Sequence, residues 1–251
     1  MTQKARRAAD LLLAVRANPA NELPDFPEAL RPADRADAYA IQRLVAASFG
    51  GIGGWKVGPF GPTPEPACSP LPAADVVASP ARFASTHRQN FIEAEVSFTI
   101  GHDLPPRAEP YTREEIIAAL AAAHPTIELV QSRFDDIDAA QPLSVMADNQ
   151  SHFALVVGPG RKDWHGLDFD AETVEQYVDG QLNQTHRGNP AGDMIRLVHW
   201  LANIGSVWAG GLKKGQIVTC GSWTGKTLVG AKADVRVHFP SLGEAHASYT
   251  V

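Results

Sequence analysis

The stretch FIEAEVSFTI, residues 91–100, indicates the fold class because apolar and polar side chains alternate along it. Apolar side chains recur at every second position: Ile92, Ala94, Val96, Phe98 and Ile100. The intervening positions include Glu93 and Glu95. A period of two is typical of a β-strand that turns one face to the core. We therefore expect a strand here, with both carboxylates on its opposite face.

Helix-forming segments precede most of the strand-like segments. Residues 3–17 and 32–48 have apolar residues at helical spacing. Thr112 and Glu115 form a capping-box pattern, which predicts a helix that runs to about Ala123. The strand-like segments cover residues 55–58, 126–130, 155–158, 174–180, 216–225 and 232–240, and one further helix is expected over 191–205. This order favours an α+β fold over a parallel α/β fold.

Two segments carry specific expectations. Residues 58–72 hold six of the nineteen prolines, which predicts an ordered loop or lid. Residues 232–240 alternate between apolar and charged side chains, which predicts an antiparallel edge strand with one wet face. No linker is visible, so we expect one domain over residues 1–251, with a helical segment at 1–50 and a β-rich core at 51–251.

Composition excludes several classes of protein. The chain has 251 residues, a net charge of −6 and no basic cluster, which argues against nucleic-acid and anionic-membrane partners. Its longest apolar run, residues 116–123, is far shorter than the roughly 20 residues of a spanning helix. Two cysteines, Cys68 and Cys220, provide neither a disulfide framework nor a zinc pattern. No signal-peptide cleavage pattern follows the first helix, so we expect a cytoplasmic protein.

Glu93 and Glu95 are the strongest chemical signal, since their Cα atoms lie about 6.5–7 Å apart on one strand face. Adjacent buried carboxylates repel one another and lose hydration, and a divalent cation removes both costs. Glu128, on a second strand after a helical crossover, can complete a site of three carboxylates. Oxygen ligands favour Mg²⁺, Mn²⁺ or Ca²⁺ over zinc. The alternative is a solvated sheet face that binds no metal.

Lys56 lies between two glycines in GWKVG, residues 54–58. Glycine allows a ligand to approach the backbone closely. A lysine beside a metal can bind a carboxylate, or it can carry protons with a lowered pKa. The alternative is an ordinary lysine at the end of a strand.

Eight segments together resemble the 2-keto-4-pentenoate hydratase family, within the fumarylacetoacetate hydrolase superfamily. They are AYAIQ (38–42), GWKVG (54–58), IEAEVSFTIGHDLP (92–105), PYTREE (110–115), IELVQSR (127–133), ADNQSHFALVVG (147–158), NPAGDMIRLVHWLAN (189–203) and LKKGQIVTCGSWTG (212–225). The resemblance implies a mixed β-roll with flanking helices, a Mg²⁺ or Mn²⁺ site and a homo-oligomer. It places the acid triad of the family on Glu93, Glu95 and Glu128, and its active-site lysine on Lys56.

The resemblance also implies a reaction. The substrate is a 2-hydroxydienoate, the enol of a 2-keto acid, and the product is a 4-hydroxy-2-oxo acid formed during aromatic-ring breakdown. Asn149, Ser151 and Ser222 are candidates for contacting substrate oxygens. Arg133 is a further candidate through bidentate pairing with a carboxylate, and an ion pair with Asp135 or Asp136 is the alternative.

The chain departs from the family pattern at two places. Many hydratases have an aspartate soon after the lysine, whereas residues 59–72 contain none, and the nearest acids are Glu65 and Asp75. Family members often have aspartate where this chain has Gln131. The absence of the first aspartate puts hydration in doubt more than it does the metal site.

A hydratase is the function that these observations favour. The alternatives are a 4-oxalocrotonate-type decarboxylase, a hydrolase that cleaves a carbon–carbon bond of an acylpyruvate, and a keto-acid binding protein without turnover. The hydrolase chemistry usually requires a histidine that activates water, and no histidine stands out in the sequence. The resemblance also includes association with a decarboxylase among the expected partners.

Overall fold

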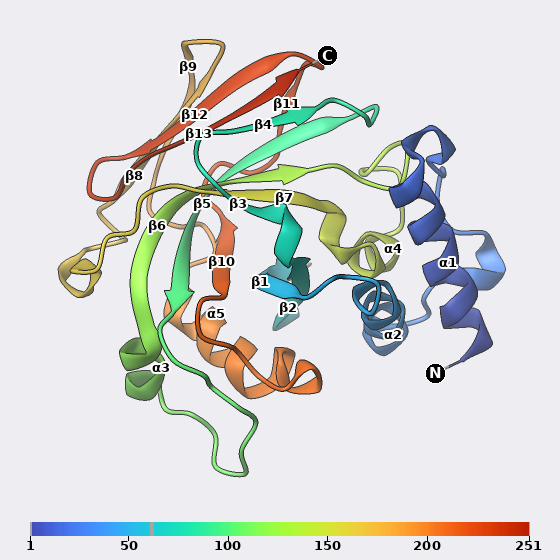
Figure 1. The fold of residues 1–251 in the computed structure, drawn as a ribbon, viewed down its shortest axis with the longest axis horizontal. Helices are drawn as coiled ribbons and strands as arrows, with labels where there is room; N and C mark the ends of the chain where they lie inside the picture. Colours follow the sequence, from blue (N-terminus) through green and yellow to red (C-terminus); the bar gives the residue numbers. More distant parts are fainter. Residues whose placement is uncertain (1, 61–62, 251) are drawn as a thin grey trace.

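The computed structural model describes residues 2–60 and 63–250 of the chain, and Figure 1 shows two sheets flanked by helices. The α-helices of these residues are α1 (Gln3–Ala17), α2 (Arg35–Ala46), α3 (Arg113–Ala119), α4 (Pro142–Ala147) and α5 (Met194–Trp200). A π-helical turn, Leu201–Gly205, continues α5. Short 3₁₀ turns lie at Pro19–Asn21, Glu28–Leu30, Ala73–Asp75, Trp164–Gly166 and Val207–Ala209. None of the helices of the described residues is long and apolar enough to cross a membrane.

The larger sheet has the strand of alternating side chains at its centre. Its strands run, in spatial order, β2 (Thr63–Pro72), β1 (Ile52–Phe60), β10 (Ile217–Ser222), β5 (Asn90–Ile100), β6 (Leu120–Val130), β7 (His152–Val157) and β3 (Val76–Ala78), and β11 (Thr227–Val229) also pairs with β5. Strand β5 confirms the predicted strand: the five apolar side chains of its alternating pattern are fully buried. Its neighbours β10 and β6 are both antiparallel to it.

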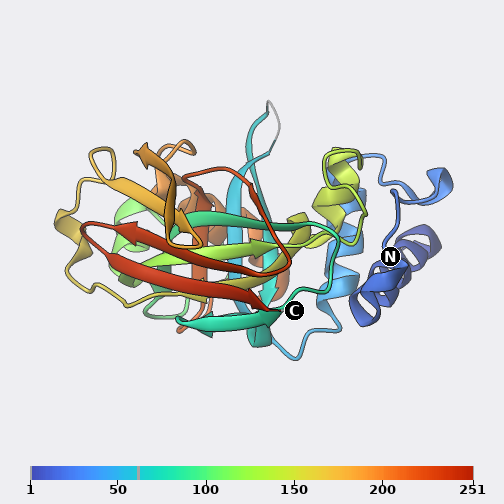
Figure 2. The ribbon, with the colours of Figure 1, turned by 90° about the horizontal axis from the view of Figure 1, so that it is seen from above.

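The smaller sheet packs against the larger one. Its order is β4 (Ala81–Ala84), β13 (Gly243–Thr250), β12 (Ala233–Phe239), β8 (Thr173–Val178) and β9 (Gln181–Arg187). Apolar residues of both sheets share one core, which includes Phe98, Ile127, Val235 and Val237. Figure 2 shows the smaller sheet at the end of the molecule away from α1 and α2. The α+β prediction is confirmed.

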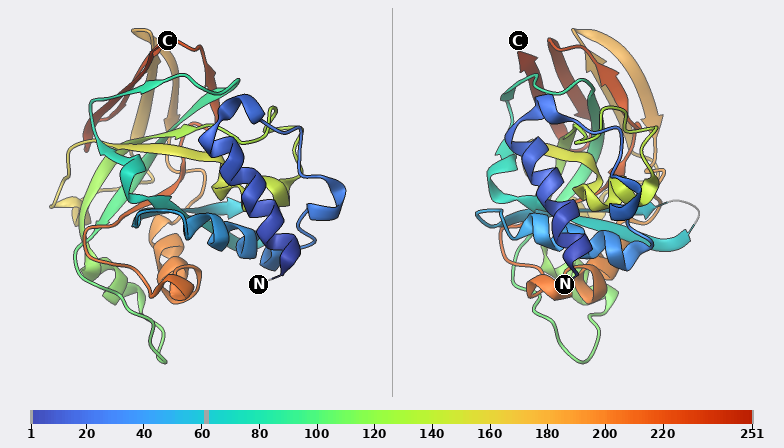
Figure 3. Two further views of the ribbon diagram at one scale, coloured as in Figure 1. Left: turned by 45° about the vertical axis from the view of Figure 1, so that its right-hand side comes forward. Right: turned by 90° about the vertical axis from the view of Figure 1, so that its right-hand side faces the viewer.

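Helices α1, α2 and α4 gather on one side of the larger sheet (Figure 3) and share a second apolar core. The first two begin at side-chain caps, since Thr2 accepts a hydrogen bond from the Ala5 N–H and Asp34 accepts one from the Asp37 N–H. The predicted helices at the start of the chain are therefore confirmed. Helix α2 is shorter than the expected range of 32–48, because Asp34 caps it and its first turn begins at Arg35.

The described residues of the proline-rich segment, 58–60 and 63–72, belong to strands, so the predicted loop or lid is wrong for them, and residues 61–62 lie outside the described residues. Residues 63–72 are β2, which pairs with β1 in an antiparallel hairpin and lies at the edge of the sheet. A central strand has a partner on each side and uses its backbone N–H groups toward both, whereas proline has no N–H to donate. Pro66, Pro70 and Pro72 are an even number of residues apart, so their nitrogens face the same edge. The other residues of β2 remain free to bond β1.

Helix α3 ends at Ala119, and the expected extension to Ala123 is wrong. The capping box of Thr112 and Glu115 is present, but β6 begins at Leu120. Pairing with β5 outweighs the helix preference of the alanines, because a sheet partner satisfies their backbone groups. The connection from β5 to β6 is antiparallel, which corrects the expected crossover.

Strand β6 also passes through His124 and Pro125, where the sequence pattern predicted a break. The Gly158 N–H donates to the Pro125 carbonyl oxygen at 2.9 Å. Proline has no N–H to return to the Gly158 carbonyl, and the His124 ring donates from Nδ1 to that oxygen at 3.0 Å instead. A side chain thus replaces the missing backbone donor.

Strand β12 lies between β13 and β8, so the predicted edge position is wrong. Its alternation is nevertheless as expected, since Val235 and Val237 are buried whereas Asp234 is exposed. An alternating pattern shows which face of a strand contacts solvent, but it does not show whether the strand has a neighbour on one side or on both.

The glycine before Lys56 serves the sheet. A Cβ on Gly54 would overlap the carbonyl oxygen of Ile217 on the neighbouring strand β10. The glycine thus lets the backbones of β1 and β10 approach, and the expected role in ligand approach does not apply to it. Gly58, by contrast, does line a cavity.

We predict that Gly54→Ala lowers the free energy of unfolding by about 1–3 kcal/mol, the usual cost of overpacking. A Cβ added to the exposed Gly50 would meet no atom within 4 Å, so Gly50→Ala should change stability by less than about 0.5 kcal/mol. Guanidinium unfolding followed by tryptophan fluorescence measures both. Equal stability of the two variants would contradict the close approach of β1 and β10.

Candidate metal centre and active site

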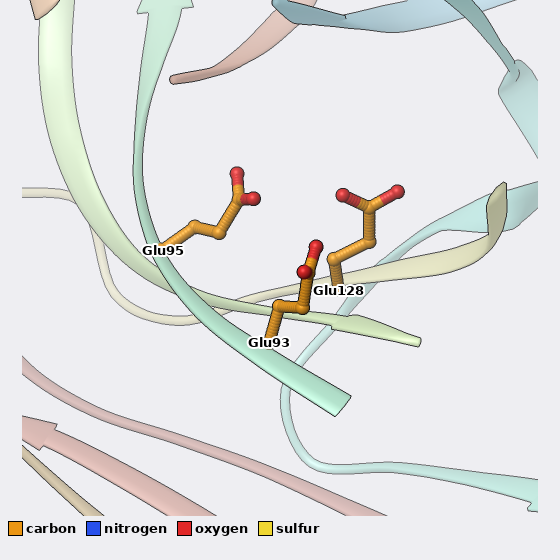
Figure 4. Close-up of side chains that lie close together, drawn as sticks. All are labelled: Glu93, Glu95 and Glu128. Atoms are coloured by element: carbon orange, nitrogen blue, oxygen red, sulfur yellow. The ribbon is translucent and has the colours of Figure 1, made fainter. Parts of the chain in front are cut away.

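Three carboxylates converge where β5 pairs with β6. Glu93 and Glu128 are direct partners in the antiparallel register, and Glu95 lies two residues further along β5. One carboxylate oxygen of each residue lies within 4.8 Å of the other two, and Figure 4 shows the side chains pointing toward a common space. Glu93 is partly exposed, but Glu95 is 2% exposed and Glu128 is fully buried, so the alternative of a solvated face is wrong.

Burial and mutual repulsion shift the ionisation of these acids. Burial is the main reason why the pKa of Glu93 is raised to about 7, and Glu128 adds to the effect. Burial, with Glu128 and Glu93, raises the pKa of Glu95 well above its ordinary value. Burial also acts to raise the pKa of Glu128, but Lys56 and His152 outweigh it and lower that pKa. The cluster therefore holds protons that a cation would displace.

Lys56 lies in the middle of β1 and reaches the acids. Its Nζ atom donates to Glu128 Oε1 at 2.8 Å and to the Gln150 carbonyl oxygen at 3.3 Å. Burial lowers the pKa of Lys56, but Glu128, Glu93 and Glu95 outweigh burial and raise it. The ammonium group stays charged, so the expectation of a lowered pKa is wrong. The interpretation of Lys56 as a lysine at a strand end is wrong as well.

A cavity of about 600 Å³ opens beside the acids. Its polar and charged lining residues are Lys56, Glu93, Glu95, Asp138, Gln150, Ser222 and Lys226. Its remaining lining residues are Val57, Gly58, Pro59, Phe60, Val130, Ile137, Ala140, Pro142, Val145 and Gly221. Ser222 is the register partner of Glu95, and its buried Oγ has no hydrogen-bond partner among the described residues. The structure thus places Ser222 beside Glu95, and its predicted contact with substrate oxygens stays a prediction.

Asn149 and Ser151 lie beside the site without lining the cavity. Both are buried, and the Asn149 side chain donates to the Pro70 carbonyl oxygen at 3.2 Å. The residue between them, Gln150, does line the cavity. All three residues have φ between 50° and 58°, a left-handed turn that is strained for residues other than glycine. This strained turn directs Gln150 toward Lys56.

Arg133 is a structural residue in this arrangement. It is 1% exposed, and its Nε donates to Asp148 Oδ1 at 2.5 Å. Its remaining side-chain donors reach the carbonyl oxygens of His152 and Asp148 at 3.0 Å each. The predicted ion pair with Asp135 or Asp136 is therefore wrong, since the partner is Asp148. Arg133 is not among the residues that line the cavity, so it does not face a substrate there.

Sequence reasoning missed two side chains that bind the acids. His152 Nδ1 donates to Glu128 Oε1 at 3.0 Å, and Thr219 Oγ1 donates to Glu95 Oε2. Both are buried. Neither position carries a local signal, because the contact depends on the pairing of β6 with β7 and of β5 with β10.

The two departures from the family pattern remain. Glu65 and Asp75 are not among the described residues that line the cavity. Burial raises the pKa of Asp75, and His152 acts in the opposite direction. Gln131 is buried and donates to Asn90 Oδ1 at 2.6 Å, so it supports β5 rather than the cavity. Cys68 and Cys220 are buried free thiols.

No protein-family model matches the chain. It is 30% identical over 162 residues to the 2-keto-4-pentenoate hydratase of Burkholderia vietnamiensis, a match that covers 63% of this chain and 60% of that protein. It is 30% identical over 135 residues to the 2-hydroxyhexa-2,4-dienoate hydratase of Comamonas testosteroni, over 52% of this chain and 48% of that protein. The chain thus spans less than two thirds of the length of these curated relatives.

A solved structure extends the likeness to the whole chain. The 4-oxalocrotonate decarboxylase from Pseudomonas putida G7, complexed with magnesium and adipate, superposes with a TM-score of 0.82 at 22% identity. The superposition covers 100% of this chain and 99% of that one. The likeness confirms the fold that the sequence resemblance implied.

We predict that Glu93→Gln stabilises the protein, relative to the wild type in EDTA, increasingly as pH rises from 5 to 8. The folded pKa of about 7 lies above the ordinary value of 4.5, so the contribution of Glu93 to stability is present below pH 4.5 and is lost as pH rises through 7. The difference in the free energy of unfolding between Glu93→Gln and the wild type should grow by on the order of 1–3 kcal/mol over this pH range. Urea unfolding at several pH values measures it. A pH-independent difference would show that Glu93 titrates normally.

Proposed function

We propose that the chain is a member of the 2-keto-4-pentenoate hydratase family and acts as a divalent-metal-dependent hydratase of 2-hydroxy-2,4-dienoates. The product would be a 4-hydroxy-2-oxo acid, in the catabolism of aromatic compounds. The observation that carries the proposal is the convergence of three carboxylates within 4.8 Å beside a charged lysine and a cavity. The names of the curated relatives support the same reaction.

In this proposal, Glu93, Glu95 and Glu128 hold a Mg²⁺ or Mn²⁺ ion. The donor set fits such an ion because it consists of carboxylate oxygens, and Glu128 Oε2 is buried without a hydrogen-bond partner among the described residues. When bound, the ion supplies positive charge that stabilises the carboxylate and the 2-oxygen of the substrate. It also offsets the repulsion that raises the pKa values of Glu93 and Glu95.

The side chains of this chain would then handle protons and orientation. Hydration adds one water molecule: the enol loses its hydroxyl proton as the terminal carbon gains one, and water then adds a hydroxyl at C4 and a proton at C3. Lys56 Nζ carries protons close to the acids and is held in place by Glu128. The unpartnered Ser222 hydroxyl and the Gln150 side chain are positioned to contact substrate oxygens.

Asn149, Ser151 and Arg133 take supporting roles in this proposal. They build the strained turn that presents Gln150, and their own polar groups lie behind the cavity wall. The missing family aspartate would have no direct substitute among the lining residues, since Asp138 is paired with Lys226. Gln150 and Lys56 are the polar groups left to orient the attacking water.

The apolar part of the cavity lining favours hydration over decarboxylation of a dicarboxylate. Val130, Ile137 and Val145 form an apolar wall and pack together in one cluster. The lining cation Lys226 is already paired with Asp138. A second carboxylate, such as the one that 4-oxalocrotonate carries, would lose hydration without gaining a free partner. An uncharged tail fits this wall better.

Other features of the proposal concern organisation. We propose that residues 1–251 form one domain, because the buried Gln42 of α2 donates to Ser69 in β2 and to the carbonyl oxygen of Met146 in α4.

A cytoplasmic location, a homo-oligomer and association with a decarboxylase stay predictions from the sequence. Decarboxylation, acylpyruvate hydrolysis and binding without turnover are the competing outcomes of a substrate assay.

We predict that the purified protein with Mg²⁺ or Mn²⁺ converts 2-hydroxypenta-2,4-dienoate to 4-hydroxy-2-oxopentanoate, and that EDTA abolishes the reaction. Loss of dienol absorbance and NMR of the product measure it. Glu95→Gln should lower kcat/KM at least about 100-fold by removing a metal ligand, whereas the exposed Glu109→Gln should not change it. Release of CO₂ from 4-oxalocrotonate without hydration would make the chain a decarboxylase, and metal-dependent binding without turnover would make it a binding protein.

We also predict that the protein prefers a substrate with an uncharged tail to a dicarboxylate. The kcat/KM for 2-hydroxyhexa-2,4-dienoate should exceed that for the enol of 4-oxalocrotonate by about tenfold or more, because the apolar wall cannot solvate a second carboxylate. Val145→Ala should lower kcat/KM for the six-carbon substrate by several-fold and leave the five-carbon substrate unchanged. Faster turnover of the dicarboxylate would show that Lys226 separates from Asp138 to bind it.

A further inference from the structure

The two oxygens of Glu128 have different surroundings. Oε1 accepts hydrogen bonds from Lys56 Nζ at 2.8 Å and from His152 Nδ1 at 3.0 Å. Oε2 is buried and has no partner among the described residues. The two donors thus hold one oxygen and leave the other for a cation, so the orientation of Glu128 depends on both of them.

His152 is fixed by the structure around it. It is the first residue of β7, its side chain is fully inaccessible, and its backbone carbonyl oxygen accepts from Arg133 Nη1 at 3.0 Å. Arg133 is in turn held by the buried carboxylate of Asp148. Within the described part of the chain, the ring makes no hydrogen bond other than the one to Glu128, since Nε2 has no partner. Because a carboxylate can only accept, Nδ1 is the donor.

The proposed hydration places two demands on Lys56. Lys56 must neutralise Glu128 in the resting site, and it must also serve the substrate during turnover. When its Nζ atom turns to the substrate, Glu128 Oε1 loses a donor in a buried setting, which is costly for a carboxylate. A second donor that does not move removes this conflict.

We propose that His152 is a positioning residue that holds Glu128 in its metal-binding orientation while Lys56 leaves it to act on the substrate. Only the part in which Lys56 leaves Glu128 to act on the substrate rests on the proposed function. The hydrogen bond from His152 to Glu128 acts on cation binding whether or not the protein turns over a dienoate. Groups that hydrogen-bond to a metal ligand typically change metal affinity by 10–100-fold when they are replaced.

Two substitutions distinguish the hydrogen bond from packing. The amide nitrogen of asparagine falls near the position of Nδ1, so His152→Asn retains a donor to Glu128. The amide of glutamine extends further, near the position of Nε2, so His152→Gln keeps the polarity and moves the donor away. His124→Asn is the matched control: this partly buried histidine of β6 bonds the Gly158 carbonyl oxygen, outside the site.

The experiment is a Mn²⁺ titration of the metal-free full chain followed by electron paramagnetic resonance, without substrate. We expect His152→Gln to raise the Kd for Mn²⁺ by about 10-fold or more, His152→Asn to stay within about threefold of the wild type, and His124→Asn to have no effect. Circular dichroism melts check that each variant is folded. If His152→Gln does not fold, the comparison of His152→Asn with His152→Ser, which is too short to reach Glu128, decides the question in the same way.

Turnover gives the second measurement. With saturating Mn²⁺, His152→Gln should lower kcat for hydration about tenfold or more while KM for the dienoate changes less than about threefold, because Lys56 cannot leave Glu128 without a replacement donor. Unchanged Mn²⁺ affinity and unchanged kcat in His152→Gln would overturn the proposal. Equal losses in the asparagine and glutamine variants would overturn it as well, since packing alone would explain them. If the wild type turns over no dienoate, the proposed function fails, and the Mn²⁺ series still tests His152.

Discussion

The repulsion among three carboxylates in a buried space is the constraint on which the rest of the site depends. Glu93, Glu95 and Glu128 share that space with one ammonium group, Lys56, so the site is short of positive charge. Burial makes the shortage costly, and two of the acids respond with raised pKa values. A divalent cation between the three carboxylates would offset the same cost.

The surrounding fold keeps the acids from separating. The register of β5 with β6 places Glu93 opposite Glu128, and the close approach of β1 to β10 brings Lys56 toward them. A buried network then links the lysine to the helical layer: Gln42 donates to the Ser69 hydroxyl, and Ser69 donates to the Gln150 side chain at 2.9 Å. Sheet, hairpin and helices thus share in placing the ammonium group of Lys56.

Local patterns predicted what depends on a few neighbouring residues, and they failed where a distant partner decides. The alternation around Glu93 predicted β5 and the shared face of its acids. The proline-rich segment became a strand because an edge position, which no local pattern reveals, tolerates proline. Arg133 pairs with Asp148, 15 residues away, rather than with a nearby aspartate. His152 reaches Glu128 only because β7 pairs with β6. Glu128 was a candidate third carboxylate from its place on a second predicted strand, and the family resemblance indicated the same triad.

The division of the cavity has a consequence for how such proteins diverge. The acids and Lys56 lie on paired strands, and Val130 of β6 also lines the cavity, whereas the rest of one wall comes from residues 137–145 and from Lys226, which belong to loops and the short helix α4. Substitutions in that wall leave the strand register intact, so they can change the tail that the site accepts without disturbing a cation. In the proposed function, hydration and decarboxylation of related keto acids would differ in the residues that meet the substrate tail. The role proposed for the carboxylates, which is to hold the cation, would be the same in both reactions.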